Sequence, residues 1–178
     1  AAFCEPLACA IHGSDLAGVK IGDTVLVIGA GGMGNLITQC VKNLGAANII
    51  VSELIEKRRE KALENGATHV IDPSKSDVNQ EVRKIKSVGA DVVFEVAGNP
   101  KAQAACPLYA RKGGTIVYFG CSPQDSLIEI NPFQINENEQ RILGSFNNQF
   151  ATARAVKMLS TGKIRVDNLI SHTFALKD

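Results

Sequence analysis

Short apolar runs alternate with amphipathic stretches along the first 120 residues. The runs at 24–28, 48–52, 69–71, 90–96 and 115–119 predict strands. Between them apolar residues recur at helical spacing, which predicts helices over 33–44, 55–64, 78–87 and from Pro100 onward. The run at 90–96 is apolar apart from Asp91 and Glu95, as is typical of a strand buried on both faces of a parallel sheet.

The last third of the chain is less regular. Residues 121–139 read as a long connection, followed by a strand at 141–146, a helix at 151–160 and a short terminal strand at 168–170. Because a proline inside a helix removes an N–H donor and clashes with the preceding turn, Pro107 predicts that the helix from Pro100 ends near Cys106. The whole pattern predicts an α/β Rossmann fold, a doubly wound parallel six-stranded sheet with helices on both faces.

A glycine-rich turn joins the first predicted strand to the first predicted helix. It reads Gly29-Ala30-Gly31-Gly32-Met33-Gly34, the G-x-G-x-x-G pattern of dinucleotide-binding turns. Gly29 permits the tight turn, Gly31 lets the backbone approach a pyrophosphate, and Gly34 lets the helix pack on the sheet. The amides of Gly32 and Met33 would face the phosphates at a helix N-terminus, where the dipole favours negative charge.

An acidic residue, Glu53, follows the second predicted strand at the position that completes this fingerprint. Its carboxylate would accept hydrogen bonds from the adenosine ribose hydroxyls and repel a 2′-phosphate, which favours NAD over NADP. Arg58 and Arg59 leave a second interpretation open. Either could accommodate a 2′-phosphate, or both could be solvated side chains of the helix at 55–64.

Three further strand ends should lie beside the glycine turn. In a doubly wound sheet the ligand binds outside the carboxyl ends of the strands, where the strand order reverses. The residues expected to enclose a nicotinamide ring there are Val96, Ala97, Gly98, Phe119, Gly120, Cys121, Ser145, Phe146 and Asn147. Val96 and Phe119 fit core packing equally well, because apolar residues line pockets as well as cores.

Composition narrows the possible functions. The chain has 178 residues, of which 45% are hydrophobic and 21% charged, as expected for one globular domain. A formal net charge of +1 gives no reason to expect nucleic acid or an anionic membrane surface as a partner. Five cysteines without C-x-x-C spacing argue against a disulfide framework and favour the cytoplasm.

Several segments together resemble the coenzyme-binding domain of the medium-chain, zinc-type alcohol dehydrogenases. They are 5–13 (EPLACAIHG), 22–31 (GDTVLVIGAG), 66–73 (GATHVIDP), 89–95 (GADVVFE), 112–117 (KGGTIV) and 162–164 (GKI). The opening Glu5-Pro6-Leu7 is most similar to the sorbitol and threonine dehydrogenase branch.

The resemblance implies hydride transfer between a secondary alcohol (a polyol, sugar alcohol or amino alcohol) and NAD, assisted by zinc. A glutamate at the position of Glu5 lies beside the zinc in that branch, so Glu5 is the catalytic and metal-ligating candidate. Cys4 is a rival ligand, and His12 fits a structural role better. The other ligands would lie outside this chain.

The resemblance also implies a domain organisation. Residues 1–20 would be a helical lead-in from an absent catalytic domain and 21–178 the NAD-binding domain of an excised fragment, inactive by itself. The strand at 141–146 would pair with its copy in a homodimer or homotetramer. Two alternatives stay open: a zinc-free NADPH-dependent quinone or enone reductase, against which Glu53 argues, and a non-catalytic dinucleotide-binding module.

Overall fold

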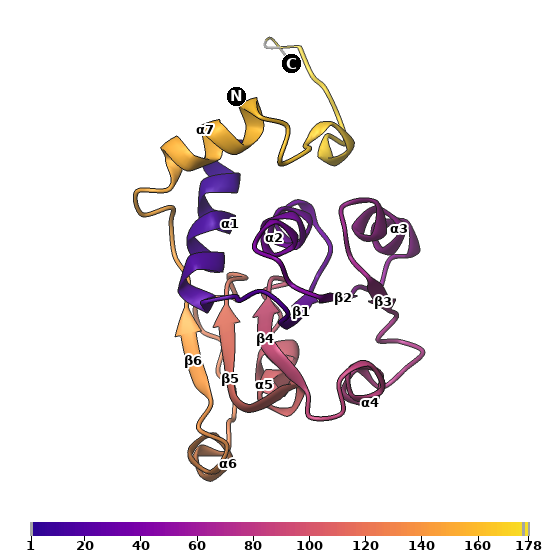
Figure 1. Ribbon diagram of the computed structural model, residues 1–178, viewed down its shortest axis with the longest axis vertical. Helices are drawn as coiled ribbons and strands as arrows, with labels where there is room; N and C mark the ends of the chain where they lie inside the picture. The colour runs from indigo at the N-terminus through magenta and orange to yellow at the C-terminus, as the bar shows by residue number, and fades with distance from the viewer. Residues whose placement is uncertain (1, 176, 178) are drawn as a thin grey trace.

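A six-stranded parallel sheet forms the centre of the computed structural model, which describes residues 2–175 and 177 (Figure 1). The strands are β1 (Thr24–Ile28), β2 (Asn48–Ser52), β3 (His69–Ile71), β4 (Ala90–Glu95), β5 (Ala110–Tyr118) and β6 (Arg141–Gly144). Their order is β3-β2-β1-β4-β5-β6, and every neighbouring pair is parallel. The predicted doubly wound α/β fold is confirmed, with the strand order reversing between β1 and β4.

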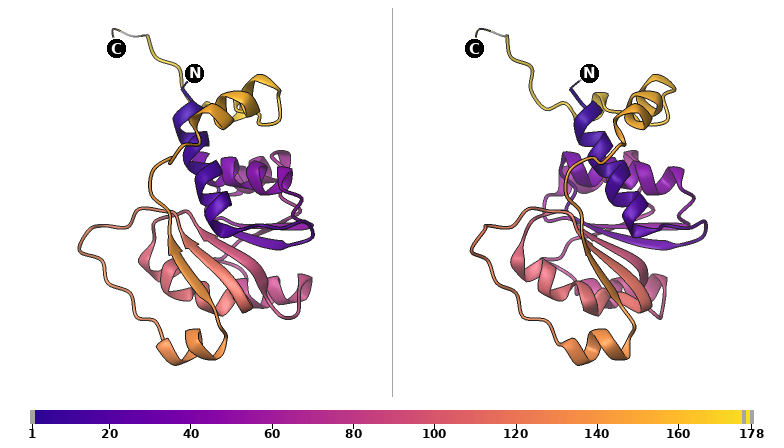
Figure 2. Two further views of the ribbon diagram at one scale, coloured as in Figure 1. Left: turned by 60° about the vertical axis from the view of Figure 1, so that its left-hand side comes forward. Right: turned by 90° about the vertical axis from the view of Figure 1, so that its left-hand side faces the viewer.

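Helices cover both faces of the sheet. They are α1 (Cys4–Ala17), α2 (Gly32–Asn43), α3 (Glu56–Glu64), α4 (Val78–Ile85), α5 (Pro100–Tyr109), α6 (Pro132–Glu137) and α7 (Thr152–Ser160). Helices α1, α2 and α3 lie on one face and α4 and α5 on the other, while α7 packs on the outside of α1 (Figures 1 and 2). Among the described residues, no helix is long and apolar enough to cross a membrane.

The alternation of side chains along β1 divides the core in two. Val25 and Val27 pack under α1 and α2, whereas Leu26 and Ile28 pack against the face that carries α4 and α5. All five residues of β1 are buried. The continuous burial of β1 and β4 explains why their sequences read as apolar runs rather than alternating ones.

Helix α5 differs from the prediction, because it continues past Cys106 to Tyr109 with Pro107 inside it. A donor from β5 replaces the amide that the proline lacks, and a side-chain donor satisfies the last turn of the helix. The carbonyl of Gln103, which a non-proline residue at 107 would have engaged, accepts a hydrogen bond from the Tyr118 hydroxyl at 3.1 Å. The carbonyl of Pro107 accepts one from Gln140 Nε2 at 2.9 Å. The prediction that this helix ends near Cys106 was therefore wrong.

The structure differs from three further predictions for the last third of the chain. The expected terminal strand at 168–170 is replaced by a 3₁₀ turn, Asp167–Leu169, in which Asn168 reaches the side chain of Asn65 rather than a neighbouring strand. The expected connection 121–139 contains α6, whose first turn is capped by the Asn131 side chain. Strand β6 ends at Gly144, two residues before the predicted boundary.

Candidate functional site

The glycine turn after β1 leaves open space above the start of α2. Gly29 has a φ of +101°, which favours glycine, and a Cβ on Gly34 would lie 1.9 Å from the Gly29 carbonyl oxygen. By contrast, a Cβ on Gly31 or Gly32 would meet no atom within 4 Å. Helix α2 begins without a side-chain cap. Its first amide groups therefore face an open space that suits an anion.

Glu53 lies directly after β2 with 8% of its surface exposed. One carboxylate oxygen accepts a hydrogen bond from the Ala30 amide of the glycine turn at 2.9 Å, and the other accepts one from the Ile55 amide at 3.0 Å. The side chain lines a cavity of about 310 Å³ between the ends of β1, β2 and β4. Gly29, Pro73, Ala97, Asn99 and Tyr109 also line this cavity.

The two neighbouring arginines differ in their surroundings. The Arg59 side chain is 12% exposed, forms an ion pair with Asp72 at 3.2 Å and donates to the Glu53 carbonyl at 2.8 Å. The Arg58 side chain is 53% exposed, and its Nη1 lies 3.8 Å from Glu53 Oε2. Arg59 is therefore occupied by contacts that hold α3 to the sheet, while Arg58 lies at the rim beside the Glu53 carboxylate.

The ends of β4 and β5 meet through two glycines. A Cβ on Gly98 would lie 2.3 Å from the Cys121 carbonyl oxygen, and one on Gly120 would lie 2.2 Å from the Gly98 amide nitrogen. Only residues without a side chain allow the two backbones to approach so closely. The structure thus brings Val96, Ala97 and Gly98 together with Phe119, Gly120 and Cys121, as the predicted crevice requires.

The end of β6 completes this side of the crevice. The Ser145 amide donates to the Tyr118 carbonyl at 3.1 Å, and the Ser145 hydroxyl and the Phe119 ring both lie against Gly13 of α1. Val96 and Phe119 are partly buried and pack against the core. Phe146 is 73% exposed, and Asn147 adopts a φ of +63°.

Sequence reasoning missed the role of Glu95 in this region. Glu95 is completely buried at the end of β4, and burial raises the pKa of its carboxyl above the ordinary value. Its acceptors are occupied by donors from residues 97, 98, 99 and 103. The available signal was an acidic residue inside an otherwise apolar strand, but the pattern gave no partner for it.

Glu5 occupies the first turn of α1, on its exposed side. The Cys9 thiol donates to Glu5 Oε1 at 3.1 Å, and burial, together with this hydrogen bond and the Glu5 charge, raises the pKa of Cys9 to about 11. Within residues 2–175 and 177, no three His, Cys, Asp or Glu side chains are grouped so that they could hold a metal. These residues alone therefore do not fit a zinc centre, and Glu5 or Cys4 could contribute at most one ligand.

Fold and site together define a dinucleotide-binding domain of the Rossmann type. Residues 32–161 match the family model described as "Zinc-binding dehydrogenase". The chain belongs to this zinc-binding dehydrogenase family, and the resemblance inferred from the sequence is confirmed.

Curated relatives match nearly the whole chain. A zinc-type alcohol dehydrogenase-like protein from Escherichia coli K12 is 33% identical, covering 99% of this chain and 50% of that protein. The sorbitol dehydrogenase of Bacillus subtilis is 31% identical with the same coverage. The chain thus spans about half the length of the curated relatives it matches.

Solved structures of two similar proteins contain dinucleotides. A zinc-binding dehydrogenase from Sinorhizobium meliloti, bound to NADP, is 42% identical with a TM-score of 0.94, covering 96% of this chain and 51% of that one. An alcohol dehydrogenase from E. coli CFT073, complexed with NADH, is 29% identical with a TM-score of 0.92, covering 99% of this chain and 52% of that one. Similar domains therefore occur with either cofactor.

Proposed function

We propose that this chain is the coenzyme-binding half of a zinc-dependent dehydrogenase that oxidises a polyol, sugar alcohol or amino alcohol with NAD. Family membership supports the proposal, as do similar proteins named sorbitol dehydrogenase and D-arabinitol dehydrogenase. In this proposal residues 21–178 bind the coenzyme and residues 1–20 lead in from the catalytic half. Ala1 and Asp178 themselves lie outside the described residues.

The observation that carries the choice of NAD is the position of Glu53. Each carboxylate oxygen accepts one backbone hydrogen bond, and each can accept another. A ribose in the adjoining cavity would supply two hydroxyl donors, whereas a 2′-phosphate would bring negative charge against a largely buried carboxylate. The pyrophosphate would lie on the open backbone at Gly31, Gly32 and Met33.

NADP is the second candidate, favoured by the NADP-bound relative and by Arg58. The guanidinium is half exposed and lies 3.8 Å from the Glu53 carboxylate. A rotation of this long side chain toward the cavity would place a positive charge beside a 2′-phosphate. In that arrangement Arg58 would have to neutralise both the phosphate and Glu53.

The chain's own contribution to catalysis would be to bind and orient the coenzyme. When bound, nicotinamide exchanges a hydride with the substrate carbon, and zinc in the complete enzyme lowers the pKa of the alcohol. The strand-end residues Val96–Gly98, Phe119–Cys121 and Ser145–Asn147 would hold the ring and exclude water from one side. Glu5, in the first turn of α1, would reach the metal from this domain.

The exposed edge of the sheet supports a proposal about assembly. In the part of the chain that the structure describes, strand β6 has a neighbouring strand on one side only, and unpaired edge strands need covering. We propose that residues 141–146 pair with a second copy in a homodimer or homotetramer. The five cysteines without C-x-x-C spacing further support action in the cytoplasm, and the relatives named sorbitol dehydrogenase and D-arabinitol dehydrogenase support a small-molecule alcohol as the substrate.

Calorimetric titration of the 178-residue chain with NADH and with NADPH tests the cofactor proposal. We expect NADH to bind more tightly, and Glu53→Gln to reduce the NADH-over-NADPH preference about tenfold, because one charge-assisted hydrogen bond contributes about 1.5–3 kcal/mol. The matched variant Arg58→Gln should leave NADH affinity within about twofold. Tighter NADPH binding, lost in Arg58→Gln, would overturn the choice of NAD and favour the reductase alternative.

The catalytic part of the proposal needs the complete protein. We expect the full-length enzyme to oxidise a polyol with NAD and to lose that activity when its zinc is chelated. Full-length protein that binds NADH but does not turn over any alcohol would instead support the non-catalytic module. Loss of activity in Glu5→Gln, with NADH affinity retained, would support the role of Glu5 beside the metal.

A further inference from the structure

Glu95 is a charged side chain with none of its surface exposed, at the last position of β4. Its Oε1 accepts hydrogen bonds from the amides of Ala97 at 2.9 Å and Asn99 at 3.3 Å. Its Oε2 accepts from the Gly98 amide and from Gln103 Nε2, both at 3.2 Å. A buried carboxylate is costly unless its acceptors are occupied, and here four donors occupy them.

The backbone of Glu95 holds the neighbouring strand end as well. Its carbonyl oxygen accepts from the amides of Phe119 at 2.9 Å and Gly120 at 2.8 Å. One residue therefore binds the loop after β4 with its side chain and the loop after β5 with its main chain. A shift of either loop would break hydrogen bonds to the same residue.

A second connection runs through Gln103 of α5. Its Nε2 reaches Glu95, while its Oε1 lies 2.8 Å from the Ser122 hydroxyl, just beyond β5. Ser122 also lies 3.2 Å from the carbonyl of Gly98. The backbones at Gly98 and Gly120 also pack closely, because a Cβ on Gly120 would lie 2.2 Å from the Gly98 amide nitrogen, so the two loops are in direct contact.

These two loops border different parts of the proposed coenzyme site. Ala97 and Asn99 line the cavity that contains Glu53, where adenosine would bind. Phe119–Cys121 follow β5, the next strand beyond β4, where they would hold the nicotinamide ring together with Val96–Gly98. The distance between the two binding regions therefore depends on the connection between the two loops.

We propose that Glu95 is a positioning residue that fixes the nicotinamide subsite relative to the adenosine subsite, acting through its hydrogen bonds to residues 97–99 and 119–120. The proposal rests on the proposed coenzyme function. It assigns Glu95 no contact with the coenzyme. Its effect should appear only with ligands long enough to occupy both subsites.

NADH and ADP-ribose separate this role from general support of the fold. ADP-ribose shares every group of NADH except the nicotinamide ring. In the 178-residue chain, Glu95→Gln keeps the side-chain shape, but its NH₂ group cannot accept the backbone hydrogen bonds made by one carboxylate oxygen. We expect NADH affinity to fall at least tenfold and ADP-ribose affinity by less than threefold. Equal losses for the two ligands, or no loss for either, would overturn the proposal.

Two variants keep the test informative if Glu95→Gln does not fold. Gln103→Met removes the side-chain links to Glu95, to the Gly120 carbonyl and to Ser122, but keeps the backbone hydrogen bonds of Glu95. It should weaken NADH more than ADP-ribose, by a smaller factor. The matched control Asn79→Ala alters a polar residue of α4, on another part of the molecule, and should weaken neither ligand. NADH binding by Gln103→Met at the wild-type affinity would count against the proposed connection.

Hydrogen exchange separates failure of this proposal from failure of the coenzyme function. Without any ligand, Glu95→Gln or Gln103→Met should speed amide exchange at residues 97–99 and also at 119–122. Exchange that rises only at 97–99 would overturn the coupling of the loops, whatever the chain binds. If both segments respond but wild-type protein binds neither NADH nor NADPH, the coenzyme proposal fails while the coupling of the loops stands.

Discussion

Glu53 and Glu95 are two glutamates at the carboxyl ends of strands in one sheet, with β1 between their strands, yet they have opposite surroundings. Glu53 borders a cavity and accepts two hydrogen bonds, so it retains acceptor capacity for a ligand. Glu95 is fully buried and accepts four. The number of free acceptor positions of a carboxylate, rather than its place among the strand ends, therefore indicates whether it is directed toward a ligand or toward the protein.

Truncation of the two glutamates should give the largest difference in the free energy of unfolding. Glu95→Ala leaves several buried donors without acceptors, so we expect the free energy of unfolding to fall by about 4 kcal/mol. Glu53→Ala leaves two amides beside an open cavity without an acceptor and should lower the free energy of unfolding by about 1–2 kcal/mol. Urea unfolding followed by circular dichroism would measure both. Equal losses would show that the two sites do not differ as described.

Two glycines near Glu53 distinguish a residue that the fold requires from one that coenzyme binding requires. Gly34→Ala would place a methyl group 1.9 Å from a carbonyl oxygen, and we expect a loss of about 2–3 kcal/mol as α2 is pushed from β1. Gly31→Ala meets no atom, so stability should change by less than about 0.5 kcal/mol. NADH affinity of Gly31→Ala should nevertheless fall at least tenfold, because the methyl group would occupy pyrophosphate space. Unaltered NADH binding would contradict that placement.

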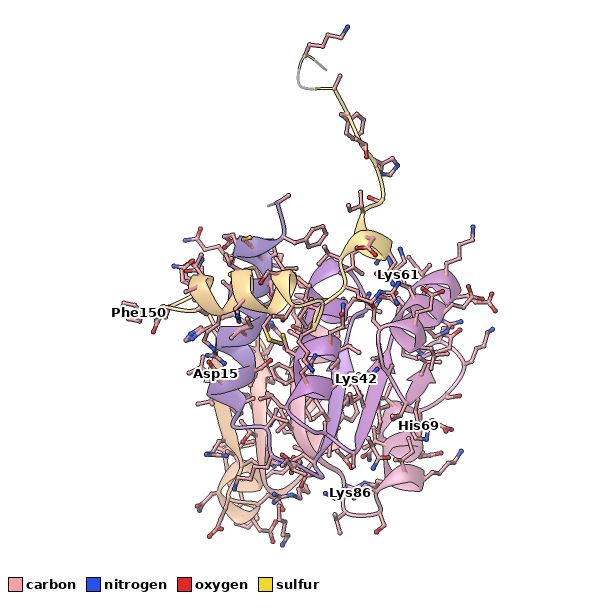
Figure 3. All side chains as sticks on the ribbon, turned by 45° about the horizontal axis from the view of Figure 1, so that its top comes forward. Asp15, Lys42, Lys61, His69, Lys86 and Phe150 are labelled. Atoms are coloured by element: carbon pink, nitrogen blue, oxygen red, sulfur yellow. The ribbon has the colours of Figure 1, made fainter. Side chains whose placement is uncertain are left out.

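Asp91 provides a third carboxylate, at the opposite end of β4, where it forms an ion pair with Lys86. Lys86 is labelled in Figure 3. Burial raises its pKa, but hydrogen bonds from Lys86 and Arg111 and from the Thr24 amide outweigh it and hold the pKa below the ordinary value. A carboxyl group whose pKa is lowered in the folded state stabilises the protein at pH values above its unfolded-state pKa. This stabilisation is lost as the pH falls through the folded-state pKa.

The Asp91→Asn variant tests this sign. We expect it to be less stable than wild type by about 2 kcal/mol at pH 7, and to lose less further stability between pH 5 and pH 3, because it has no carboxylate to protonate at this site. Urea unfolding at several pH values would show the difference. A variant with the same acid-induced loss as wild type would exclude Asp91 as a source of acid sensitivity.

The smallest effects should come from the arginines beside Glu53. Arg59→Ala removes hydrogen bonds to the carbonyls of Glu53 and Leu54 and should cost about 1 kcal/mol. Arg58→Ala alters a half-exposed side chain and should change stability by less than about 0.5 kcal/mol. Thermal melts of the two variants, recorded together, would rank them. A reversed order would mean that Arg58 supports α3 more than its contacts indicate.

The sequence predicted most of the first half of the fold. The strands β1, β2 and β3 match their apolar runs residue for residue, because glycines and an Asp-Pro pair delimit them. The G-x-G-x-x-G spacing also located the turn at Gly29–Gly31 before α2, and the acid that completes this fingerprint pointed to Glu53. Local signals were sufficient there, because each residue's role depends on its near neighbours in the chain.

The remainder depended on contacts that no local pattern contains. Glu95 finds its donors because the chain turns back at Gly98, which a buried acid in a strand does not reveal. Asn131-Pro132 lies within the stretch 121–139 that was expected to be a long connection, although the same pair of residue types at Asn99-Pro100 begins α5. The expected strand at 168–170 lacks a neighbouring strand to pair with, a condition that only the tertiary fold sets.

Pro107 determines where helix α5 is attached to the sheet. By lacking an amide proton, it frees a carbonyl on the face of α5 turned toward β5, and the Tyr118 hydroxyl occupies that position. An alanine at 107 would restore the helix's own bond and compete with the tyrosine for the same oxygen. The one hydrogen bond that is missing from the helix thus defines the position at which the neighbouring strand is anchored to it.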